Sequence, residues 1–361
     1  MQIDPGLFQE NERTQPTVLG RQSLSIGPLD LESGARLEDV VVAYETWGTL
    51  SPARDNAILV CHALTGDSHA IGWWSRLVGP GKPIDTDRHY VVCANVLGGC
   101  QGSTGPASLA SDGKPYGSRF PIITVGDMVN AQKRLIDHLG IPCLLAIAGG
   151  SMGGMLALDW TVRYPGSVRK AFITASGAAH SAMQIGFNEA ARQAIMRDAK
   201  WLGGDYPLDE GPEGGLAVAR MIGHLSFLCE EAFTAKFGRR LQGKSHYEYH
   251  TGVEFEVESY LNYQGDKFTK RFDANSLIVV TRAIDYFDLK TLKRSTTEYL
   301  FVSYTTDWLY PTHQSVELNA MAITAGCRSS HVEIDLPFGH DAFLLDADVQ
   351  GPELCALLAR E

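Results

Sequence analysis

The chain has 361 residues, of which 44% are hydrophobic and 20% are charged, and its formal net charge is -11. This composition is typical of a globular protein with a sizeable core, and the negative charge argues against nonspecific binding to nucleic acid or to an anionic membrane. Residues 1–12 show no basic stretch followed by an apolar one, and no apolar stretch is long enough to span a membrane. We therefore expect a cytoplasmic protein.

The cysteines are seven in number, an odd and scattered set with no CxxC pair. A zinc site is not expected from such spacing, and we predict no metal site in this chain. Cys61, Cys93 and Cys143 lie in apolar stretches, so we expect them to be small core residues in a reducing compartment.

The first half of the chain alternates between predicted strands and predicted helices. Nearly continuous apolar stretches, which are typical of parallel strands buried on both faces, occur at residues 40–45, 57–61, 90–94, 144–148 and 171–174. Helical patterns occur at residues 128–136 and 155–164. This alternation predicts an α/β fold with a mostly parallel sheet and helices on both faces.

The alternation stops between about residue 180 and about residue 292. Helical patterns prevail there, at residues 190–201, 215–228 and 273–287. Strands and helices resume at residues 299–303, 314–325, 332–336 and 352–360. We therefore predict a core formed by residues 1–179 and 293–361, interrupted by an inserted helical lid at residues 180–292. Such an insertion would lie over the carboxyl edge of the sheet, where ligands of α/β proteins bind.

Ser151 lies in the most informative motif of the chain, Gly149-Gly150-Ser151-Met152-Gly153-Gly154. The motif follows a predicted strand and precedes a predicted helix, which is the context of a nucleophile elbow. Glycines permit the tight turn, and the amino end of the following helix favours developing negative charge. Ser151 is therefore the predicted nucleophile.

A nucleophilic serine needs a base, and the base needs a third group to hold it. On this topology the chain order is Ser, then Asp or Glu, then His. Asp307 and His340 each follow a late predicted strand, and we predict that they complete a triad with Ser151. Asp285 and Asp288 are competing acids, which we interpret as surface or helix-end charges because they lie in the helical segment.

Two backbone N–H groups are needed to stabilise the oxyanion of acyl transfer. We predict that Met152, directly after the nucleophile, and Leu64, in the loop after the strand at residues 57–61, supply them. His62 in the same loop is interpreted as structural, because His340 is the better candidate for the base. The Gly-rich stretch 95–105 lacks the spacing of a phosphate-binding loop and is predicted to be a tight loop near the site.

Several longer stretches resemble signatures of the homoserine O-acetyltransferase family, from about Tyr44 onward. They are residues 61–69, 78–88, 95–105, 264–268, 271–276 and 339–344. The resemblance implies an α/β-hydrolase fold with a helical lid, a homodimer formed through that lid, and no permanently bound cofactor. It implies acetyl transfer from acetyl-CoA, as co-substrate, to the hydroxyl of L-homoserine in methionine biosynthesis.

The resemblance also implies roles for individual residues. By motif match Ser151, Asp307 and His340 form the family triad, Arg220 holds the substrate carboxylate and Asp341 holds its ammonium group. These charges suit a zwitterionic amino acid, since a guanidinium forms a planar fork for a carboxylate. Relatives often have a tyrosine where this chain has Phe227, so a hydroxyl contact of that tyrosine would be absent here.

The predicted mechanism is a ping-pong transfer through an acetyl-Ser151 intermediate. Succinyl-CoA is used by some relatives, often with an arginine two positions after the triad aspartate, where this chain has Leu309. Acetyl is therefore the favoured group. A homoserine O-succinyltransferase, a serine O-acyltransferase, an esterase or thioesterase, and a noncatalytic binding protein stay open as alternatives, because the triad itself serves several acceptors.

Overall fold

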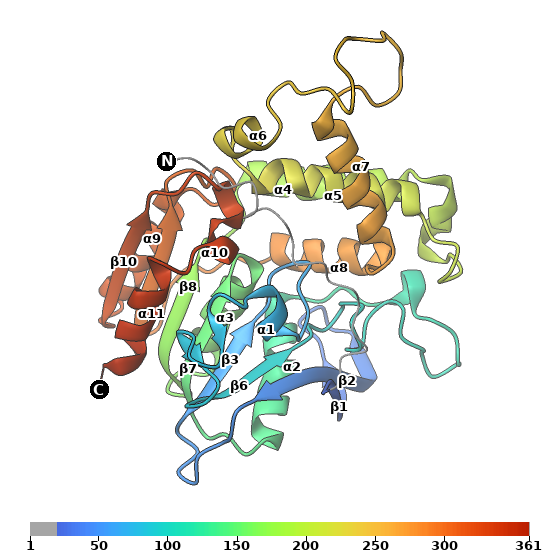
Figure 1. Ribbon diagram of the computed structural model, residues 1–361. Helices are drawn as coiled ribbons and strands as arrows, with labels where there is room; N and C mark the ends of the chain where they lie inside the picture. The colour runs from blue at the N-terminus through green and yellow to red at the C-terminus, as the bar shows by residue number, and fades with distance from the viewer. Residues whose placement is uncertain (1–19, 361) are drawn as a thin grey trace.

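The computed structural model describes residues 20–360, which form an eight-stranded sheet with helices on both sides (Figure 1). The strands are β1 (Gln22–Asp30), β2 (Arg36–Trp47), β3 (Ala57–Cys61), β6 (Tyr90–Ala94), β7 (Leu144–Gly150), β8 (Val168–Thr174), β9 (Glu298–Tyr304) and β10 (Ser329–Ile334). Their order in the sheet is β1-β2-β6-β3-β7-β8-β9-β10. The pairs β1–β2 and β2–β6 are antiparallel and the other neighbours are parallel, so the predicted mostly parallel sheet is confirmed.

Alternate residues of the central strands are buried on opposite faces of the sheet, as the period of a strand requires. Leu59 joins one apolar cluster, whereas Ile58 and Val60 join another. Helices α2 (Val125–His138), α3 (Met152–Arg163) and α9 (Thr312–Thr324) contribute to the first cluster. Helices α1 (Ala70–Trp73), α10 (Ala342–Leu345) and α11 (Gln350–Ala359) contribute to the second. The remaining short elements outside residues 175–297 are β4 (Val78–Gly79), β5 (Ile84–Asp85), η2 (Gly117–Arg119) and η4 (Gly339–Asp341).

The segment between β8 and β9 is helical, with no strand longer than an isolated bridge in residues 175–297. Its elements are α4 (Ala182–Met196), η3 (Ala199–Gly204), α5 (Glu213–Phe227), α6 (Glu230–Lys236), α7 (Glu256–Thr269) and α8 (Ala274–Asp285). A third apolar cluster joins α4, α5, α7 and α8, and these helices lie above the sheet in Figure 1.

Several elements differ from the expectation: helices α6 and α7 match no predicted helix, and β1 and α4 are two further cases. Strand β1 was not predicted, because it is an edge strand with mostly exposed side chains and irregular pairing around Gly27, so no apolar stretch marks it. Helix α4 begins eight residues before the predicted start at residue 190. Ser181 and Gln184 form a capping box at its amino end, with the Ser181 N–H donating to Gln184 Oε1 at 2.6 Å.

The cysteines are all free in the structure. Cys61 and Cys93 are buried as expected, and burial raises the pKa of both thiols. Cys143 is only partly buried, since it precedes β7 and its thiol points to the carbonyl of Gly166, so the core assignment was wrong for this residue.

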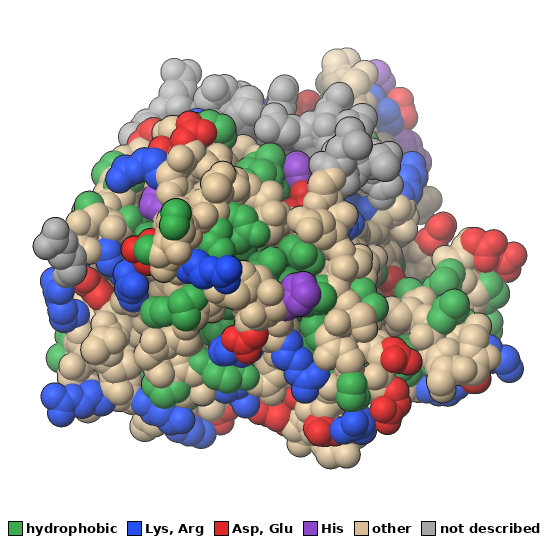
Figure 2. Space-filling model, turned by 90° about the horizontal axis from the view of Figure 1, so that it is seen from below, with side chains coloured by type: hydrophobic (Ala, Val, Ile, Leu, Met, Phe, Trp, Pro, Cys, Tyr) green, Lys and Arg blue, Asp and Glu red, His purple; other side chains and the backbone are tan. Residues whose placement is uncertain are grey.

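Two further observations concern the surface. Within residues 20–360 no helix combines the length and apolar character needed to cross a membrane. On the face seen in Figure 2, acidic and basic side chains are interspersed with apolar ones, so neither sign of charge dominates this face.

Candidate active site

Ser151 forms the junction between β7 and α3 in a strained backbone conformation, with φ 55° and ψ -125°. A non-glycine residue with positive φ is uncommon and is characteristic of functional turns. The neighbouring glycines are required by close backbone approach: a Cβ on Gly149 would clash with the carbonyl of Gly153, and a Cβ on Gly153 with that of Cys61. The tight strand–turn–helix geometry predicted around Ser151 is therefore present.

Asp307 and His340 lie beyond the carboxyl ends of β9 and β10 and are hydrogen bonded to each other. The Nδ1 atom of His340 is 2.8 Å from Oδ2 of Asp307, and both side chains are buried. An ionised Asp307 accepts the Nδ1–H bond, which leaves Nε2 of a neutral imidazole as a proton acceptor. The other carboxylate oxygen of Asp307 accepts backbone N–H bonds from Leu309 at 3.0 Å and Tyr310 at 2.8 Å.

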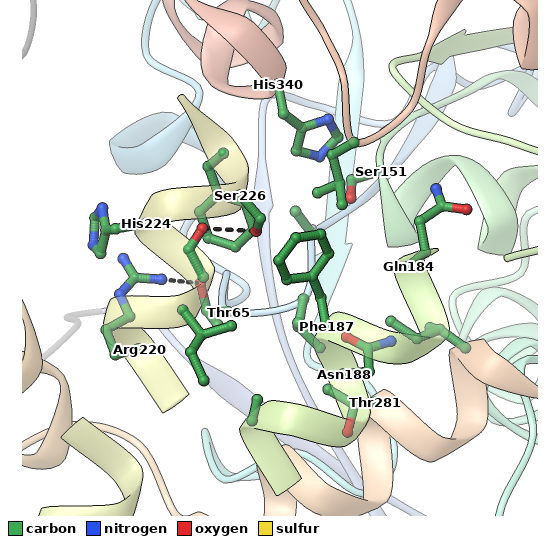
Figure 3. A pocket seen from close by; sticks show the side chains of 18 of the residues that line it. Thr65, Ser151, Gln184, Phe187, Asn188, Arg220, His224, Ser226, Thr281 and His340 are labelled. Carbon is green, nitrogen blue, oxygen red and sulfur yellow. Dashed lines mark hydrogen bonds between the residues drawn. The ribbon is translucent and has the colours of Figure 1, made fainter. Parts of the chain in front are cut away.

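Ser151 and His340 line one cavity of about 170 Å³, and Figure 3 shows their side chains next to each other. The cavity lies between the sheet edge and the helices α4, α5, α7 and α8. Gly339, with φ +65°, permits the close packing of η4 on the end of α5, because a Cβ there would lie 2.6 Å from the backbone nitrogen of Cys229. The three predicted catalytic side chains are thus brought to one rim of the sheet from distant positions in the chain.

The loop after β3 carries the predicted oxyanion residue Leu64, which lines the same cavity. Met152, the other predicted donor, is the first residue of α3 and is buried. His62 is buried beneath this loop, with Nδ1 2.8 Å from the carbonyl of Ala63 and Nε2 accepting the backbone N–H of Val96 at 3.1 Å. Both ring nitrogens are therefore engaged with backbone groups, and burial lowers the pKa of His62.

The contacts of His62 also explain the Gly-rich stretch 95–105. Val96 belongs to this stretch, so His62 joins it to the loop of Leu64. The glycine at position 98 has φ +82°, and its N–H donates to the carbonyl of Thr104. The stretch is therefore a tight loop beside the site, as predicted.

Arg220 and Asp341 line the cavity together with Ser151. Arg220 lies on α5, where its guanidinium stacks 4.9 Å from the ring centroid of Phe268 and Nη1 donates to Thr65 Oγ1 at 3.2 Å. Asp341 follows His340 directly in η4. A cation and an anion thus line one small cavity from two neighbouring elements, and a zwitterion requires both charges.

Comparisons with known proteins identify the family to which the chain belongs. The model of the alpha/beta hydrolase fold family matches residues 56–347. A homoserine O-acetyltransferase of Solidesulfovibrio magneticus is 52% identical over 340 residues, which is 88% of this chain and 86% of that relative. One of Desulfotalea psychrophila is 49% identical over 344 residues, which is 89% of this chain and 88% of the relative. The chain belongs to the homoserine O-acetyltransferase family.

Solved structures give the same fold. A homoserine O-acetyltransferase from Bacillus anthracis has a TM-score of 0.88 and 26% identity, covering 94% of this chain and 98% of that one. Esterase E22 has a TM-score of 0.86 and 28% identity, and the match covers 94% of this chain and 99% of the esterase chain. The predicted α/β-hydrolase fold is therefore confirmed, and the architecture is shared by homoserine O-acetyltransferases and esterases.

Phe227 stands where the family resemblance led us to expect a tyrosine. Its ring centroid lies 6.1 Å from that of His340, so the side chain at this position borders the predicted base without a hydroxyl. Tyr310 provides a hydroxyl on the same cavity, and its ring stacks on His340 at 5.0 Å. Tyr310 lies three residues after Asp307 but was not predicted to line the site, because it belongs to no catalytic motif of the sequence.

Asp285 was interpreted as a surface or helix-end charge, and the structure places it at a helix end but not at the surface. It is the last residue of α8, but its side chain is only 5% exposed and lies 2.9 Å from His180 and 2.7 Å from Arg192. Burial is outweighed by these hydrogen bonds, so the pKa of Asp285 is lowered. Asp288, by contrast, is half exposed and pairs with Lys290, as expected for a surface charge.

Proposed function

We propose that this protein transfers an acetyl group from acetyl-CoA to the hydroxyl of L-homoserine through an acetyl-Ser151 intermediate, as a step of methionine biosynthesis. One observation carries the proposal. The bonded Asp307–His340 pair and Ser151 border a cavity that also presents Arg220 and Asp341. The family assignment at about half identity over most of the chain supports the same reaction.

In the first half-reaction, Nε2 of His340 takes the proton of Ser151 as Oγ forms a bond to the thioester carbonyl carbon. The N–H groups of Leu64 and Met152 stabilise the oxyanion. The carbon–sulfur bond then breaks, and the CoA thiolate takes the proton from His340. Acetyl-Ser151 and free CoA thiol result, with no change in oxidation state.

In the second half-reaction, the homoserine hydroxyl gives its proton to His340 and its oxygen attacks the acetyl carbon. The bond to Oγ breaks, and Ser151 recovers its proton from His340. Arg220 would hold the homoserine carboxylate and Asp341 its ammonium group, so the hydroxyl is presented to the acetyl carbon in a fixed orientation.

Acetyl-CoA carries phosphates far from its thioester, and a second cavity of about 400 Å³ suits them. It shares Ala63, Thr65, Arg220, Phe268 and Leu344 with the catalytic cavity. Lys267, Lys270 and Arg271 line it as well, so cations gather there in a chain of net charge -11. We place the phosphate-bearing end of the co-substrate in this second cavity.

The Lys270→Ala variant tests this placement. We expect the KM for acetyl-CoA to rise about threefold to tenfold, because one exposed cation contributes roughly 1 kcal/mol to a phosphate contact. The KM for acetyl-N-acetylcysteamine, a thioester without phosphates, should stay unchanged. Lys290→Ala is the matched control, since Lys290 is an exposed lysine that pairs with Asp288. An equal change for both thioesters would contradict the placement.

The helical segment 180–292 is proposed to act as a lid over the site and to form a homodimer. Exposed apolar side chains on these helices support such an interface, among them Met183, Val218, Leu225 and Tyr263. Light scattering on the protein and on Leu225→Asp tests the dimer. A monomeric parent protein, or a variant with the mass of the parent dimer, would contradict it.

We propose that the protein acts in the cytoplasm and has no permanently bound cofactor.

The decisive experiment follows thiol release from acetyl-CoA with homoserine, with serine and with neither. Release that depends on homoserine supports the proposed reaction, and release that depends on serine indicates the serine O-acyltransferase. Release without an acceptor indicates a thioesterase, an alternative favoured by the structural likeness to esterase E22. A faster reaction with succinyl-CoA would reverse the choice of donor, which rests on Leu309 at the cavity wall.

A further inference from the structure

The predicted oxyanion residue Leu64 lies in a tight turn formed by residues 63–66. The N–H of Gly66 donates to the carbonyl of Ala63 at 2.9 Å, and this bond closes the turn. Leu64 and Thr65 are the two central residues, and neither has a positive φ, as in a type I turn. The closing bond does not use the N–H of Leu64, and Leu64 lines the catalytic cavity.

Two peptide groups of this turn are connected in series. The carbonyl of Ala63 and the N–H of Leu64 belong to one planar peptide, and the two groups point in opposite directions because the peptide is trans. The carbonyl of Thr65 and the N–H of Gly66 belong to a second such peptide. The bond that closes the turn joins the two peptides, so the orientation of the Thr65 carbonyl is coupled to that of the Leu64 N–H.

Arg271, in the helical segment above the sheet, holds the outer end of this series. Its Nη2 donates to the carbonyl of Thr65 at 3.0 Å. Its guanidinium lies 5.5 Å from the ring centroid of Phe268, and its own carbonyl accepts the Nε2–H of Gln101 at 2.7 Å. The side chain and the backbone of Arg271 are therefore both fixed. A hydrogen bond from a cation is strong, and each bond in such a chain polarises the next one.

His62 holds the inner end of the series. Its Nε2 accepts the backbone N–H of Val96, so a neutral imidazole carries its proton on Nδ1. Nδ1 lies 2.8 Å from the carbonyl of Ala63 and donates to it. This carbonyl therefore accepts two hydrogen bonds, and the N–H on the same peptide is that of Leu64.

Two arginines reach Thr65, and they bind different groups of it. Arg220 donates to the side-chain hydroxyl at 3.2 Å, the dashed line in Figure 3, whereas Arg271 donates to the main-chain carbonyl. Arg220 lines the catalytic cavity, but Arg271 lines only the second one. The bond from Arg271 therefore acts on the backbone of the turn, at a distance from the reacting groups.

We propose that Arg271 is a positioning residue for the oxyanion site. Its guanidinium holds the Thr65 carbonyl, keeps the turn closed and polarises the N–H of Leu64 through the two peptides. This donor is thus oriented before negative charge develops on the carbonyl oxygen of the thioester. The inference rests on Leu64 being an oxyanion donor, as proposed above.

The proposal separates Arg271 from residues that recognise substrates. An oxyanion forms in both half-reactions, so loss of the Arg271 guanidinium slows both of them and leaves the KM for homoserine unchanged. A phosphate contact would matter only for acetyl-CoA, whereas an oriented oxyanion donor also matters for an acetyl ester without phosphates.

Arg271→Met removes the donors and keeps an unbranched side chain on Phe268. We expect the rate constant of the p-nitrophenol burst from p-nitrophenyl acetate to fall about tenfold, less than the 10²- to 10³-fold that loss of an oxyanion donor typically costs. The inhibition constant of phenylboronic acid, whose tetrahedral adduct with Ser151 mimics the oxyanion, should rise by about the same factor. Arg239→Met is the matched control, since its guanidinium also lies 5.5 Å from a phenylalanine ring but outside both cavities.

The burst itself distinguishes positioning from a purely structural role. Its amplitude counts the folded active sites, so a variant that is only less stable loses amplitude and keeps the rate constant. Arg271→Lys is the second variant, because lysine keeps a charged donor for the Thr65 carbonyl. We expect its burst rate constant to lie between those of the parent and of Arg271→Met.

Leu64→Pro removes the oxyanion donor itself, and proline is favoured at this position of a type I turn. Relative to Leu64→Ala, which keeps the N–H, we expect the burst rate constant to fall at least 10²-fold. Adding Arg271→Met to Leu64→Pro should cause less than a threefold further loss, because its effect passes through the missing N–H.

The possible outcomes separate this inference from the proposed function. A parent-like burst rate constant in Arg271→Met, together with a strong loss in Leu64→Pro, would overturn the inference alone, as would losses that multiply in the double variant. If Leu64→Pro reacted as fast as Leu64→Ala, the oxyanion donor itself would be refuted, and the inference with it. A burst that persists in Ser151→Ala would refute the nucleophile and therefore the proposed function.

Discussion

Nδ1 of His340 lies 2.8 Å from Oδ2 of Asp307, and the side chains are 4% and 0% exposed. The pair is therefore shielded from water, and the carboxylate determines which imidazole nitrogen carries the proton. Its second oxygen is already occupied by two backbone N–H groups, so Oδ2 is the atom that holds the imidazole. Geometry and tautomer are thus fixed before any substrate arrives.

Asp307→Asn is predicted to abolish most of the activity while the fold persists. An asparagine amide presents an N–H group to one side and favours the wrong imidazole tautomer, so we expect kcat to fall by about 10³- to 10⁴-fold. Steady-state thiol release from acetyl-CoA measures the loss, and circular dichroism checks the fold. Asp288→Asn, at a half-exposed aspartate, is the control. An Asp307→Asn variant with a tenth or more of the parent kcat would show that Asp307 is not the triad acid.

Gly153→Ala is predicted to destabilise the protein strongly. The added Cβ would meet the backbone carbonyl of Cys61, and backbone at the junction of β3 and α3 cannot move without disturbing the sheet. We expect a loss of about 3 kcal/mol or more in the free energy of unfolding, the range of overpacked or strained core substitutions. Denaturant unfolding followed by circular dichroism measures it.

Gly186→Ala provides the matched control for that prediction. Gly186 is exposed in the interior of α4, with nothing within 4 Å of an added Cβ. Alanine there should stabilise the protein by about 0.5–1 kcal/mol, because glycine is a poor helix residue. Equal effects of the two substitutions would contradict the role given to the close approach at Gly153.

His62 makes the stability depend on pH in a defined direction. Burial lowers its pKa in the folded state below the ordinary value of 6.5, so the unfolded chain binds more protons between the two values. The contribution of neutral His62 is therefore fully present above about pH 6.5 and is lost as the pH falls toward the lowered pKa. Burial also lowers the pKa of His89 and of His331.

Urea unfolding at pH 7.5 and 5.5 tests this assignment. We expect the free energy of unfolding of the parent protein to be lower at pH 5.5, and a smaller decrease in His62→Gln, in which one titrating group is removed. His138→Gln, on the carboxyl end of α2 and exposed, is the control. If the free energy of unfolding decreased as much in His62→Gln as in the parent protein, His62 would be excluded as a source of this pH dependence.

Local patterns explain why so much of the site was predictable. Ser151 lies in a glycine-flanked turn that close packing demands, and Asp307 and His340 follow apolar strands whose carboxyl ends share one edge. No local pattern indicated the pair His180–Asp285, because its two residues lie in a loop and at a helix end that are more than a hundred residues apart. Burial of Asp285 depends on Arg192 and on how α4 packs against α8, which no local periodicity encodes.

The edge of the sheet shows the same limit. Strand β1 pairs with β2 through backbone groups while most of its side chains face solvent, so hydrophobic alternation could not indicate it. The start of α4, by contrast, was encoded locally by Ser181 and Gln184 and was overlooked. Local pattern therefore indicates neither long-range packing nor an edge strand whose side chains face solvent.

Arg220→Lys is predicted to affect the acceptor more than the nucleophile. Lysine keeps the positive charge but loses the planar fork that binds a carboxylate through two parallel bonds, and it also loses the stacking on Phe268. We expect the KM for homoserine to rise about 10- to 100-fold, which corresponds to roughly 1.4–2.7 kcal/mol. The burst of p-nitrophenol from p-nitrophenyl acetate should stay within about twofold, because acetylation does not involve the carboxylate of homoserine. Arg197→Lys, at an arginine outside both cavities, is the control. If the rate of the p-nitrophenol burst fell by as large a factor as the KM for homoserine rose, Arg220 would serve both half-reactions. Recognition of the acceptor alone would then be contradicted.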